Sequence, residues 1–299
     1  MPQVLTLVAP PGGLSPAALA RVRDALGALG AAAGTPDWLA EAEAADLPFD
    51  GLAAEQAVAA ARAALGKAAP VDAIAQGAEG RRKRLLLADM DSTIVTTETL
   101  DELAAFAGLK DRIAEITRRA MNGELDFRAA LLERVGMLAG LPISALERTW
   151  AETRLTPGAE ALVHTMRAQG GAHCALVSGG FAFFTARVAE QAGFHEHHSN
   201  TLLVEDGKLT GRVAEPILDR DAKLAALKRL CAERGLPLSA ALTVGDGAND
   251  LPMIGAAGLG VAFRAKPVVA AAARARVDHA DLRALLFAQG YRAAEIVGA

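Results

Sequence analysis

The feature that most constrains the fold is a set of apolar runs that each end at acidic or glycine-rich residues. Leu85–Ala88 is a continuous apolar run, and Asp89 follows it at once. A run without polar alternation is typical of a central strand in a parallel sheet, which is covered on both faces. The stretches 171–177 and 241–244 repeat the pattern, and a helical pattern follows each. This alternation predicts an open, doubly wound α/β sheet, in which ligands bind at the carboxyl ends of the strands.

The first 80 residues show a different order of elements. Strands are expected at 3–9 and 70–76, and helices at 16–30 and 53–66, with extended chain between the two helices. This order is compatible with a small α+β domain of the ferredoxin-like type. We therefore predict a separate N-terminal domain over residues 1–80.

The remainder of the chain is expected to form one larger domain over residues 84–299. The segment before it is GAEGRRKR at 77–84. Its four basic residues alone are weak evidence for a nucleic-acid site, so we predict a solvated linker. Residues from about 98 to 152 show several helical patterns and no clear strand, which indicates a helical insert. Further on, an Asp-Gly pair between two apolar segments predicts a β-hairpin over 201–213.

Composition narrows the classes of function. Apolar residues make up 52% of the chain and charged residues 22%, which is enough for buried cores and gives no sign of disorder. The net charge of −4 argues against nucleic acid or an anionic membrane as the main partner, because both favour a basic face. The sequence has no uninterrupted apolar stretch of about 18 residues, and its start lacks the basic region of a signal peptide. We therefore expect a cytoplasmic protein.

The cysteines and the clustered histidines are expected to have no catalytic role. Cys174 and Cys231 lack the CxxC spacing and are predicted to be reduced core thiols. His195, His197 and His198 have no partner at ligand spacing elsewhere in the sequence. We expect them in a solvated loop before the hairpin, not in a metal site.

The first segment that can carry chemistry is DMDST, residues 89–93. Asp89 and Asp91 leave the end of a strand together, so one carboxylate can attack phosphorus while the other serves as acid and base. A carboxylate that attacks a phosphate dianion meets charge repulsion, so a hard cation such as Mg²⁺ is needed beside it. Taken alone, the pair could equally be a solvated turn.

Three further segments lie at expected strand ends or helix starts. Ser178 offers a hydroxyl group, and Gly179 and Gly180 let backbone N–H groups approach an anion. Lys223 lies at the start of a helix, where a cation opposes the helix dipole unless it binds an anion. The segment GDGAND at 245–250 gathers carboxylates around a glycine turn, which is costly unless a cation is bound. Together the four segments supply the groups that phosphoryl transfer requires.

On these motifs the chain resembles the haloacid dehalogenase (HAD) superfamily, and within it the phosphatases of O-phospho-L-serine. The motifs are DMDST at 89–93, SGG at 178–180, Lys223 and GDGAND at 245–250. The resemblance covers roughly residues 84–290 and implies a doubly wound HAD core with a helical cap, formed by the insert at about 98–152. The N-terminal 80 residues match only loosely. In longer bacterial members a small, regulatory-looking domain of the ACT-like, amino-acid-binding type occupies this place.

The resemblance implies a role for each motif residue. Asp89 would be the nucleophile that becomes phosphorylated, and Asp91 the proton donor and later the base. Mg²⁺ would be bound by the carboxylates of Asp89 and Asp246 and by the backbone carbonyl of Asp91. The other motif residues would bind or order the phosphate: Ser178, Gly179, Lys223, Asn249 and, behind them, Asp250.

Substrate choice would depend on the cap. Glu98 would pair with the ammonium group of phosphoserine and Arg134 with its carboxylate, while Met121 and Phe127 would form an apolar wall. Three alternatives stay open: another phosphomonoester such as phosphoethanolamine, phosphocholine or a phosphosugar; a non-catalytic amino-acid sensor; and phosphotransfer to another alcohol. The resemblance also allows a homodimer through the N-terminal domain, which could bind serine and regulate.

Overall fold

The computed structural model describes residues 3–66 and 69–298, so residues 1–2, 67–68 and 299 of the predicted domains lie outside the description. The chain divides into two units. One comprises Met1–Arg84, Pro157–Ala172 and Arg274–Ala299, and the other comprises Leu85–Thr156 and His173–Ala273. The first division coincides with the boundary expected near residue 84. Two later segments group with the N-terminal residues in addition.

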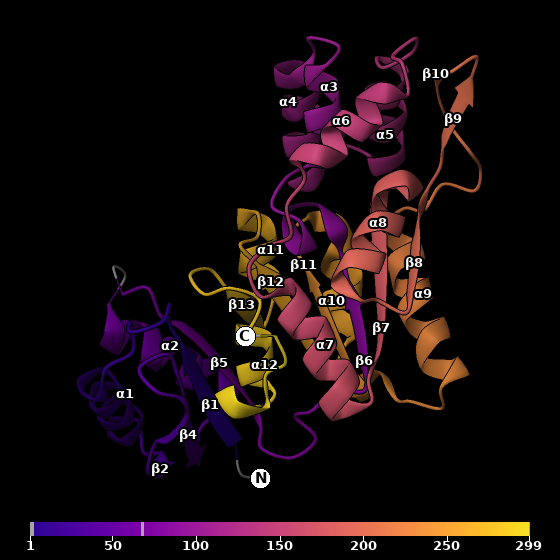
Figure 1. Cartoon of the computed structure of the whole chain (residues 1–299). Coiled ribbons are helices and arrows are strands. Elements are labelled where there is room, and N and C mark those ends of the chain that lie inside the picture. The colour runs from indigo at the N-terminus through magenta and orange to yellow at the C-terminus, as the bar shows by residue number, and fades with distance from the viewer. Residues whose placement is uncertain (1–2, 67–68, 299) are drawn as a thin grey trace. The chain divides into compact units, whose positions relative to one another are not determined.

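The N-terminal part of the first unit is an antiparallel sheet with two helices (Figure 1). Its elements are β1 (Gln3–Val8), α1 (Pro16–Ala28), β2 (Ala32–Ala33), β3 (Asp37–Ala40), β4 (Ala44–Asp50), α2 (Ala54–Leu65) and β5 (Asp72–Gly77). Strand β1 lies between β4 and β5 and pairs antiparallel with both, while β2 and β3 pair with β4. This is the ferredoxin-like order that the sequence predicts.

Apolar side chains between the sheet and the helices form the core of this part. Leu5 and Leu7 of β1 pack with Val22 and Leu26 of α1, and all four are fully buried. The start of α1 has the expected cap, because the Ser15 hydroxyl accepts the Ala18 N–H and Pro16 follows at the first helical position.

Four elements from later in the chain complete the first unit. They are α7 (Ala159–Gly170), β13 (Ala275–Val277), α12 (Ala284–Ala288) and the 3₁₀ turn η4 (Ala293–Glu295). Asp72, at the start of β5, accepts three backbone N–H groups that follow β13, from Asp278, His279 and Ala280, at 2.8–3.1 Å. A buried carboxylate that accepts several N–H bonds is well satisfied, so the C-terminal segment is hydrogen-bonded to the N-terminal sheet.

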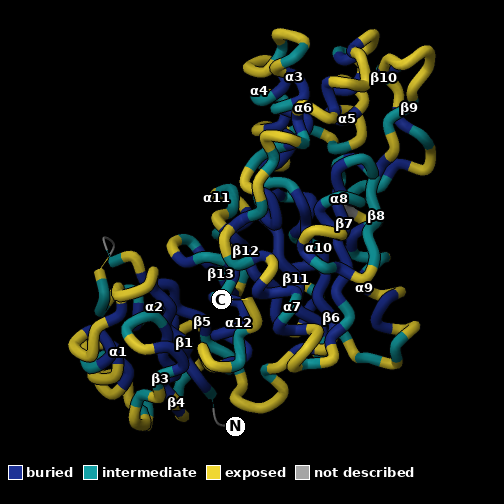
Figure 2. The backbone as a smooth tube through the Cα atoms, viewed as in Figure 1, coloured by how far each residue is buried: buried dark blue, intermediate teal, exposed yellow. Residues whose placement is uncertain are grey.

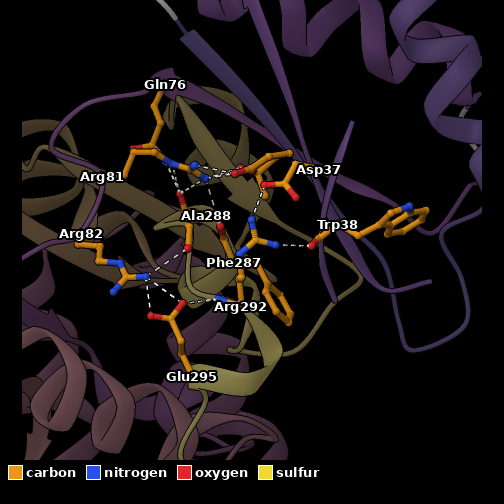
Figure 3. Close-up of polar contacts among 12 residues, drawn as sticks. Asp37, Trp38, Gln76, Arg81, Arg82, Phe287, Ala288, Arg292 and Glu295 are labelled. Atoms are coloured by element: carbon orange, nitrogen blue, oxygen red, sulfur yellow. Dashed lines mark hydrogen bonds and ion pairs between the residues drawn. The ribbon is translucent and has the colours of Figure 1, made fainter. Parts of the chain in front are cut away.

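Arg81 forms a second connection between the N-terminal sheet and the C-terminal segment (Figure 3). Its Nη1 donates to Asp46 Oδ2 at 2.6 Å and its Nη2 to Asp46 Oδ1 at 3.0 Å, and Nη2 also donates to the Ala288 carbonyl at 3.0 Å. Gln76 Nε2 donates to that same carbonyl at 2.6 Å. Lys83 is 6% exposed, and its backbone N–H donates to Gln289. The prediction of a solvated linker is therefore wrong for Arg81 and Lys83, because they supply partners for the C-terminal segment, while the other residues of 77–84 are exposed.

The second unit is built on five parallel strands in the order β12-β11-β6-β7-β8. The strands are β6 (Leu85–Ala88), β7 (His173–Phe181), β8 (Glu196–Asn200), β11 (Ala241–Gly245) and β12 (Leu259–Phe263), and the helices of this layer are α8 (Ala182–Ala192), α9 (Arg220–Glu233), α10 (Leu251–Ala256) and α11 (Pro267–Ala272). Strands β6 and β11 are buried along their whole length (Figure 2). The order places the carboxyl ends of β11, β6 and β7 side by side.

The cap consists of the four helices that follow β6. They are α3 (Thr99–Ala105), α4 (Lys110–Met121), α5 (Phe127–Gly136) and α6 (Ser144–Glu152), as the expected insert at 98–152 requires. The hairpin of β9 (Leu202–Glu205) and β10 (Lys208–Val213) lies beside α5 (Figure 1). The Gly140 N–H donates to the Leu209 carbonyl and the Ile143 N–H to that of Gly207. The hairpin is thus part of the cap. The sequence does not indicate this contact, because the hairpin lies far from the cap helices along the chain.

The SGG motif lies at a strand end before a helix, as the sequence predicts. Strand β7 continues past the expected end at Val177 through Ser178–Phe181, where its pairing with β8 becomes irregular. The predicted solvated histidine loop holds for His195, which is exposed and precedes the strand, but is wrong for His197 and His198, because Glu196–Asn200 forms the edge strand β8. There Glu196 contacts His173 at 2.5 Å and His198 at 2.7 Å. Within the described residues, no helix has the length and apolar character needed to cross a bilayer.

The Arg81 contacts lead to a stability prediction. Arg81→Ala leaves the Asp46 carboxylate, whose side chain is 9% exposed, without its cation. Removing one partner of a buried ion pair is strongly destabilising, so we expect the free energy of unfolding to fall by about 3 kcal/mol in urea titrations. The control is Arg82→Ala, whose partner Glu295 is more exposed, and it should cost about 1 kcal/mol or less. Equal losses for the two variants would contradict the interpretation.

Candidate active site

Asp89 and Asp91 are positioned by the end of β6. The Asp89 N–H donates to the Val244 carbonyl at 3.0 Å, which continues the pairing of β6 with β11 by one residue. The chain then turns through η1 (Met90–Ile94), a π-helical turn in which Ser92 has φ of 52°. A positive φ is costly for a residue with a side chain. The turn keeps both carboxylates at the carboxyl edge of the sheet.

Lys223, near the start of α9, lies between two of the acidic groups. Its Nζ is 2.7 Å from Asp89 Oδ1 and 2.6 Å from Asp250 Oδ1, and the side chain is fully buried. Burial by itself lowers the pKa of Lys223, but the carboxylates of Asp250 and Asp89 outweigh it and raise the pKa above its ordinary value. The lysine therefore stays charged and orients the carboxylate of Asp89.

Three carboxylates form a candidate metal site. Oxygen atoms of Asp89, Asp246 and Asp250 lie within 4.8 Å of one another. Asp246 is 2% exposed, and its Oδ2 has no hydrogen-bond partner in the described part of the chain. Burial, and then repulsion from Glu98 and Asp89, raises the pKa of Asp246 well above its ordinary range. Buried carboxylate oxygens with an unmatched lone pair suit a hard divalent cation such as Mg²⁺.

The Asp91 carboxylate is oriented toward the cap side of the site. Its Oδ1 accepts the Thr99 N–H at 2.8 Å, and its Oδ2 lies 3.3 Å from the Ser178 hydroxyl, which donates to it. Burial, and then repulsion from Glu98 and Asp89, raises the pKa of Asp91 to about 8. A carboxyl group with such a pKa holds a proton near neutral pH and can deliver it.

The SGG motif forms the wall opposite Asp91. Ser178 is 1% exposed, and its Oγ accepts the Gly180 N–H at 2.9 Å. A Cβ at Gly179 would come within 2.5 Å of the Phe127 ring, and one at Gly180 within 2.7 Å of Asp91 Oδ2. Glycine is therefore required at both positions because the cap and the acid approach the strand closely.

Two charged cap residues reach the same pocket. Glu98 Oε1 accepts the Ser92 hydroxyl at 2.6 Å, and burial raises the pKa of Glu98. Arg134 on α5 is 3% exposed, and its Nη1 donates to Thr117 Oγ1 at 2.8 Å. The Thr117 hydroxyl in turn donates to Asp101 Oδ1 at 2.6 Å. These two hydrogen bonds orient the guanidinium group of Arg134.

The pocket gathers ten of the residues that the sequence singles out. They are Asp89, Asp91, Glu98, Met121, Phe127, Arg134, Ser178, Gly179, Asp246 and Asn249. Lys223 and Asp250 lie beneath them, and the Asp250 Oδ2 accepts the Gly247 N–H at 3.1 Å. The Asn249 Oδ1 is buried and has no partner among the described residues. The free space is about 30 Å³, room for roughly two water molecules.

Sequence reasoning missed several residues of the site. Leu100, Leu131 and Phe181 also line the pocket, and Asp101 and Thr117 support Arg134. Leu100 and Leu131 are ordinary apolar positions of cap helices, and Asp101 is one of two acidic residues in the first turn of α3. Gly180, which belongs to the SGG motif, lines the pocket as well.

The haloacid dehalogenase-like hydrolase family matches residues 86–255 of the chain, more than half of its length. The chain belongs to this family. It is 48% identical over 200 residues to the phosphoserine phosphatase of Streptococcus thermophilus, a match that covers 67% of this chain and 93% of that protein. Strands β7 and β11, and β6 from its second residue onward, lie with their acidic and glycine-rich ends inside the region 86–255 that the family matches.

A longer relative and a solved structure agree with this family. The chain is 45% identical over 243 residues, 81% of its length, to the phosphoserine phosphatase of Streptomyces coelicolor, but it spans only 58% of that relative. The chain thus spans little more than half the length of this relative. A solved structure described as a phospho-aspartyl intermediate analogue of phosphoserine phosphatase matches 69% of this chain and 98% of its own, with a TM-score of 0.66 and 39% identity.

The raised carboxyl pKa values give a pH prediction for the metal-free protein. The pKa of Asp91 is about 8 and that of Asp250 about 7, the latter raised mainly by burial. The folded state therefore binds more protons than the unfolded chain between about pH 4 and pH 8. Its free energy of unfolding should fall as pH rises through this window, on the order of 1 kcal/mol per pH unit.

Urea unfolding in EDTA at pH 5.5, 6.5, 7.5 and 8.5 would measure this slope. Excess Mg²⁺ is the control, and it should flatten the slope because a bound cation favours ionised carboxylates. Stability that rises with pH in EDTA would contradict the assignment of these groups.

Proposed function

We propose that the protein is a Mg²⁺-dependent phosphatase that hydrolyses O-phospho-L-serine to L-serine and phosphate through a phospho-aspartate on Asp89. This reaction is the last step of serine biosynthesis. The observation that carries the proposal is one pocket whose lining includes Asp89 and Asp91 from the end of β6 together with Glu98 and Arg134 from the cap. The names of the relatives, which are phosphoserine phosphatases, support the same substrate.

The metal would be held by the carboxylates of Asp89 and Asp246 and by the backbone carbonyl of Asp91. A bound Mg²⁺ would neutralise charge between the attacking carboxylate and the phosphate. Asp250 has its oxygens committed to Lys223 and to the Gly247 N–H. We therefore assign it to the support of the site and not to direct metal binding.

In the first step Asp89 attacks phosphorus in line. The bond between its carboxylate oxygen and phosphorus forms while the bond from phosphorus to the serine oxygen breaks. Asp91, protonated at neutral pH, gives its proton to that leaving oxygen. Lys223, the Ser178 hydroxyl and the Gly179 N–H would bind the non-bridging oxygens, where negative charge must be stabilised.

In the second step water hydrolyses the intermediate. Asp91, now ionised, takes a proton from a water molecule whose oxygen attacks phosphorus, and the bond from Asp89 to phosphorus breaks. The nucleophile is restored and phosphate leaves. A closed cap would exclude other water during the first step, and phosphate and serine could leave only after the cap opens.

The two charges of the cap suit the serine moiety. Glu98 would bind the ammonium group and Arg134 the carboxylate, in a bidentate contact. Met121 and Phe127 would pack on the short carbon chain between them. A phosphomonoester without a carboxylate would leave the pocket side of a buried guanidinium group without a hydrogen-bond acceptor, which is unfavourable.

We further propose that residues 1–80 form an ACT-like regulatory domain and that residues 84–299 carry catalysis. The ferredoxin-like strand order supports the first assignment. We place the protein in the cytoplasm. Cys174 and Cys231 are buried and form no disulfide within the described residues, which is consistent with a reducing compartment.

The first test is release of inorganic phosphate from O-phospho-L-serine. Asp89→Asn removes the nucleophile, so we expect at least a 10³-fold loss of kcat, consistent with the loss of a covalent step. EDTA should abolish the activity and Mg²⁺ should restore it. Thermal unfolding of Asp89→Asn serves as the folding control. Full activity of this variant would rule out a phospho-aspartate on Asp89.

The second test separates phosphoserine from other phosphomonoesters. Arg134→Ala should lower kcat/KM for O-phospho-L-serine about 100-fold, mainly through KM, because a buried charge-assisted contact is lost. Activity on p-nitrophenyl phosphate, which has no carboxylate, should change little. Arg134→Lys keeps the charge without the bidentate geometry and should lie between. An equal loss on both substrates would count against the carboxylate assignment.

A further inference from the structure

Lys266 reaches the metal site from a loop that the motifs do not include. The chain leaves β12 and turns at Arg264, whose φ of 43° lies in the left-handed region, before α11 begins at Pro267. The Lys266 N–H donates to the Asp246 carbonyl at 3.0 Å. A backbone hydrogen bond therefore fixes this loop beside the carboxyl end of β11, where Asp246 follows.

The side chain of Lys266 also contacts Asp246. Its Nζ lies 3.4 Å from Asp246 Oδ2, the oxygen without a hydrogen-bond partner among the described residues. The distance makes an ion pair but not a well-formed hydrogen bond. Lys266 is 30% exposed whereas Asp246 is 3% exposed at the side chain. The ammonium group can thus move toward water while the carboxylate stays in place.

The other cations of the pocket are committed elsewhere. Lys223 contacts Asp89 and Asp250, and Arg134 is hydrogen-bonded to Thr117 on the cap. Among the side chains that the structure describes, the cation in ion-pair contact with Asp246 is Lys266. A buried carboxylate without a counter-charge is costly, so Lys266 supplies the charge that the metal-free site needs.

We propose that Lys266 is a resident counter-ion of the metal site, which pairs with Asp246 in the metal-free protein and competes with the divalent cation for it. The inference rests on the metal site of the proposed function. One carboxylate oxygen cannot contact both cations at full strength, and the two cations repel each other. Lys266 therefore weakens metal binding and makes the metal exchangeable, while it stabilises the empty site. It is a positioning residue and touches neither substrate nor phosphate in this proposal.

The test is calorimetric titration of the metal-free protein with Mg²⁺, without substrate. Lys266→Met should lower the dissociation constant for Mg²⁺ about tenfold, the effect of one positive charge near a divalent ion in a water-like dielectric. Lys266→Arg keeps the charge and should stay within about twofold of the wild type. Lys228→Met, an exposed lysine on α9 with the same change in net charge, should leave the constant unchanged.

Thermal unfolding gives a second, independent readout. Without metal, Lys266→Met should melt at a lower temperature than the wild type, because Asp246 has lost its counter-ion. The rise in melting temperature on adding Mg²⁺ should be larger in the variant than in the wild type. A residue that only packs against the loop would lower the melting temperature without enlarging its rise on adding Mg²⁺.

Other results would overturn the proposal. Unchanged Mg²⁺ affinity in Lys266→Met would mean that the lysine does not compete with the metal. Weaker affinity would mean that it orients Asp246 for the metal instead. Asp246→Asn should abolish binding, and if it does not, the metal is bound elsewhere and the proposal fails. None of these measurements uses phosphoserine, so their outcome is independent of whether the protein cleaves it.

Discussion

The rest of the site depends on one buried lysine between two carboxylates. Lys223 has no exposed surface and lies within 2.7 Å of both Asp89 and Asp250. Without it, the acidic residues at the ends of β6 and β11 would repel one another in a region that water cannot screen. The lysine lies near the start of α9, so the helix, and not only the sheet, determines where the Asp89 carboxylate points. Although Lys223 is present, burial keeps the pKa values of Asp246 and Asp250 raised. A bound divalent cation would stabilise the ionised form of these carboxylates.

The cap uses a second buried charge for a different purpose. Arg134 belongs to α5, and its partners Thr117 and Asp101 come from α4 and α3. Three helices therefore orient one guanidinium group toward a pocket that Phe127 closes against Gly179. The hairpin of β9 and β10 packs on the same helix. In the proposed function, recognition of the substrate thus depends on the same contacts that pack the cap against the strand.

The first unit shows how segments far apart in sequence can share one structure. Asp72 and Arg81 satisfy backbone groups of the C-terminal segment, and Asp46 accepts both Nη groups of Arg81. Each of these is a buried polar interaction, which is costly to break once formed. A short basic stretch that reads as a solvated linker is therefore part of the fold, because its side chains meet their partners only when residues 274–299 return beside it.

The sequence by itself determined the sheet, the cap and the chemistry of the motifs. Continuous apolar runs predict buried parallel strands because only such strands need no polar face, and Asp89, Ser178 and Asp246 follow from the ends of those strands. Local signals also placed the Ser15 cap and the hairpin turn. Only the tertiary structure brings together Thr117 and Arg134, the β9–β10 hairpin and α5, and Lys266 and Asp246. It also places His197 and His198 in a strand. Those contacts join residues that no local period connects, and their strength depends on burial, which only the folded chain creates.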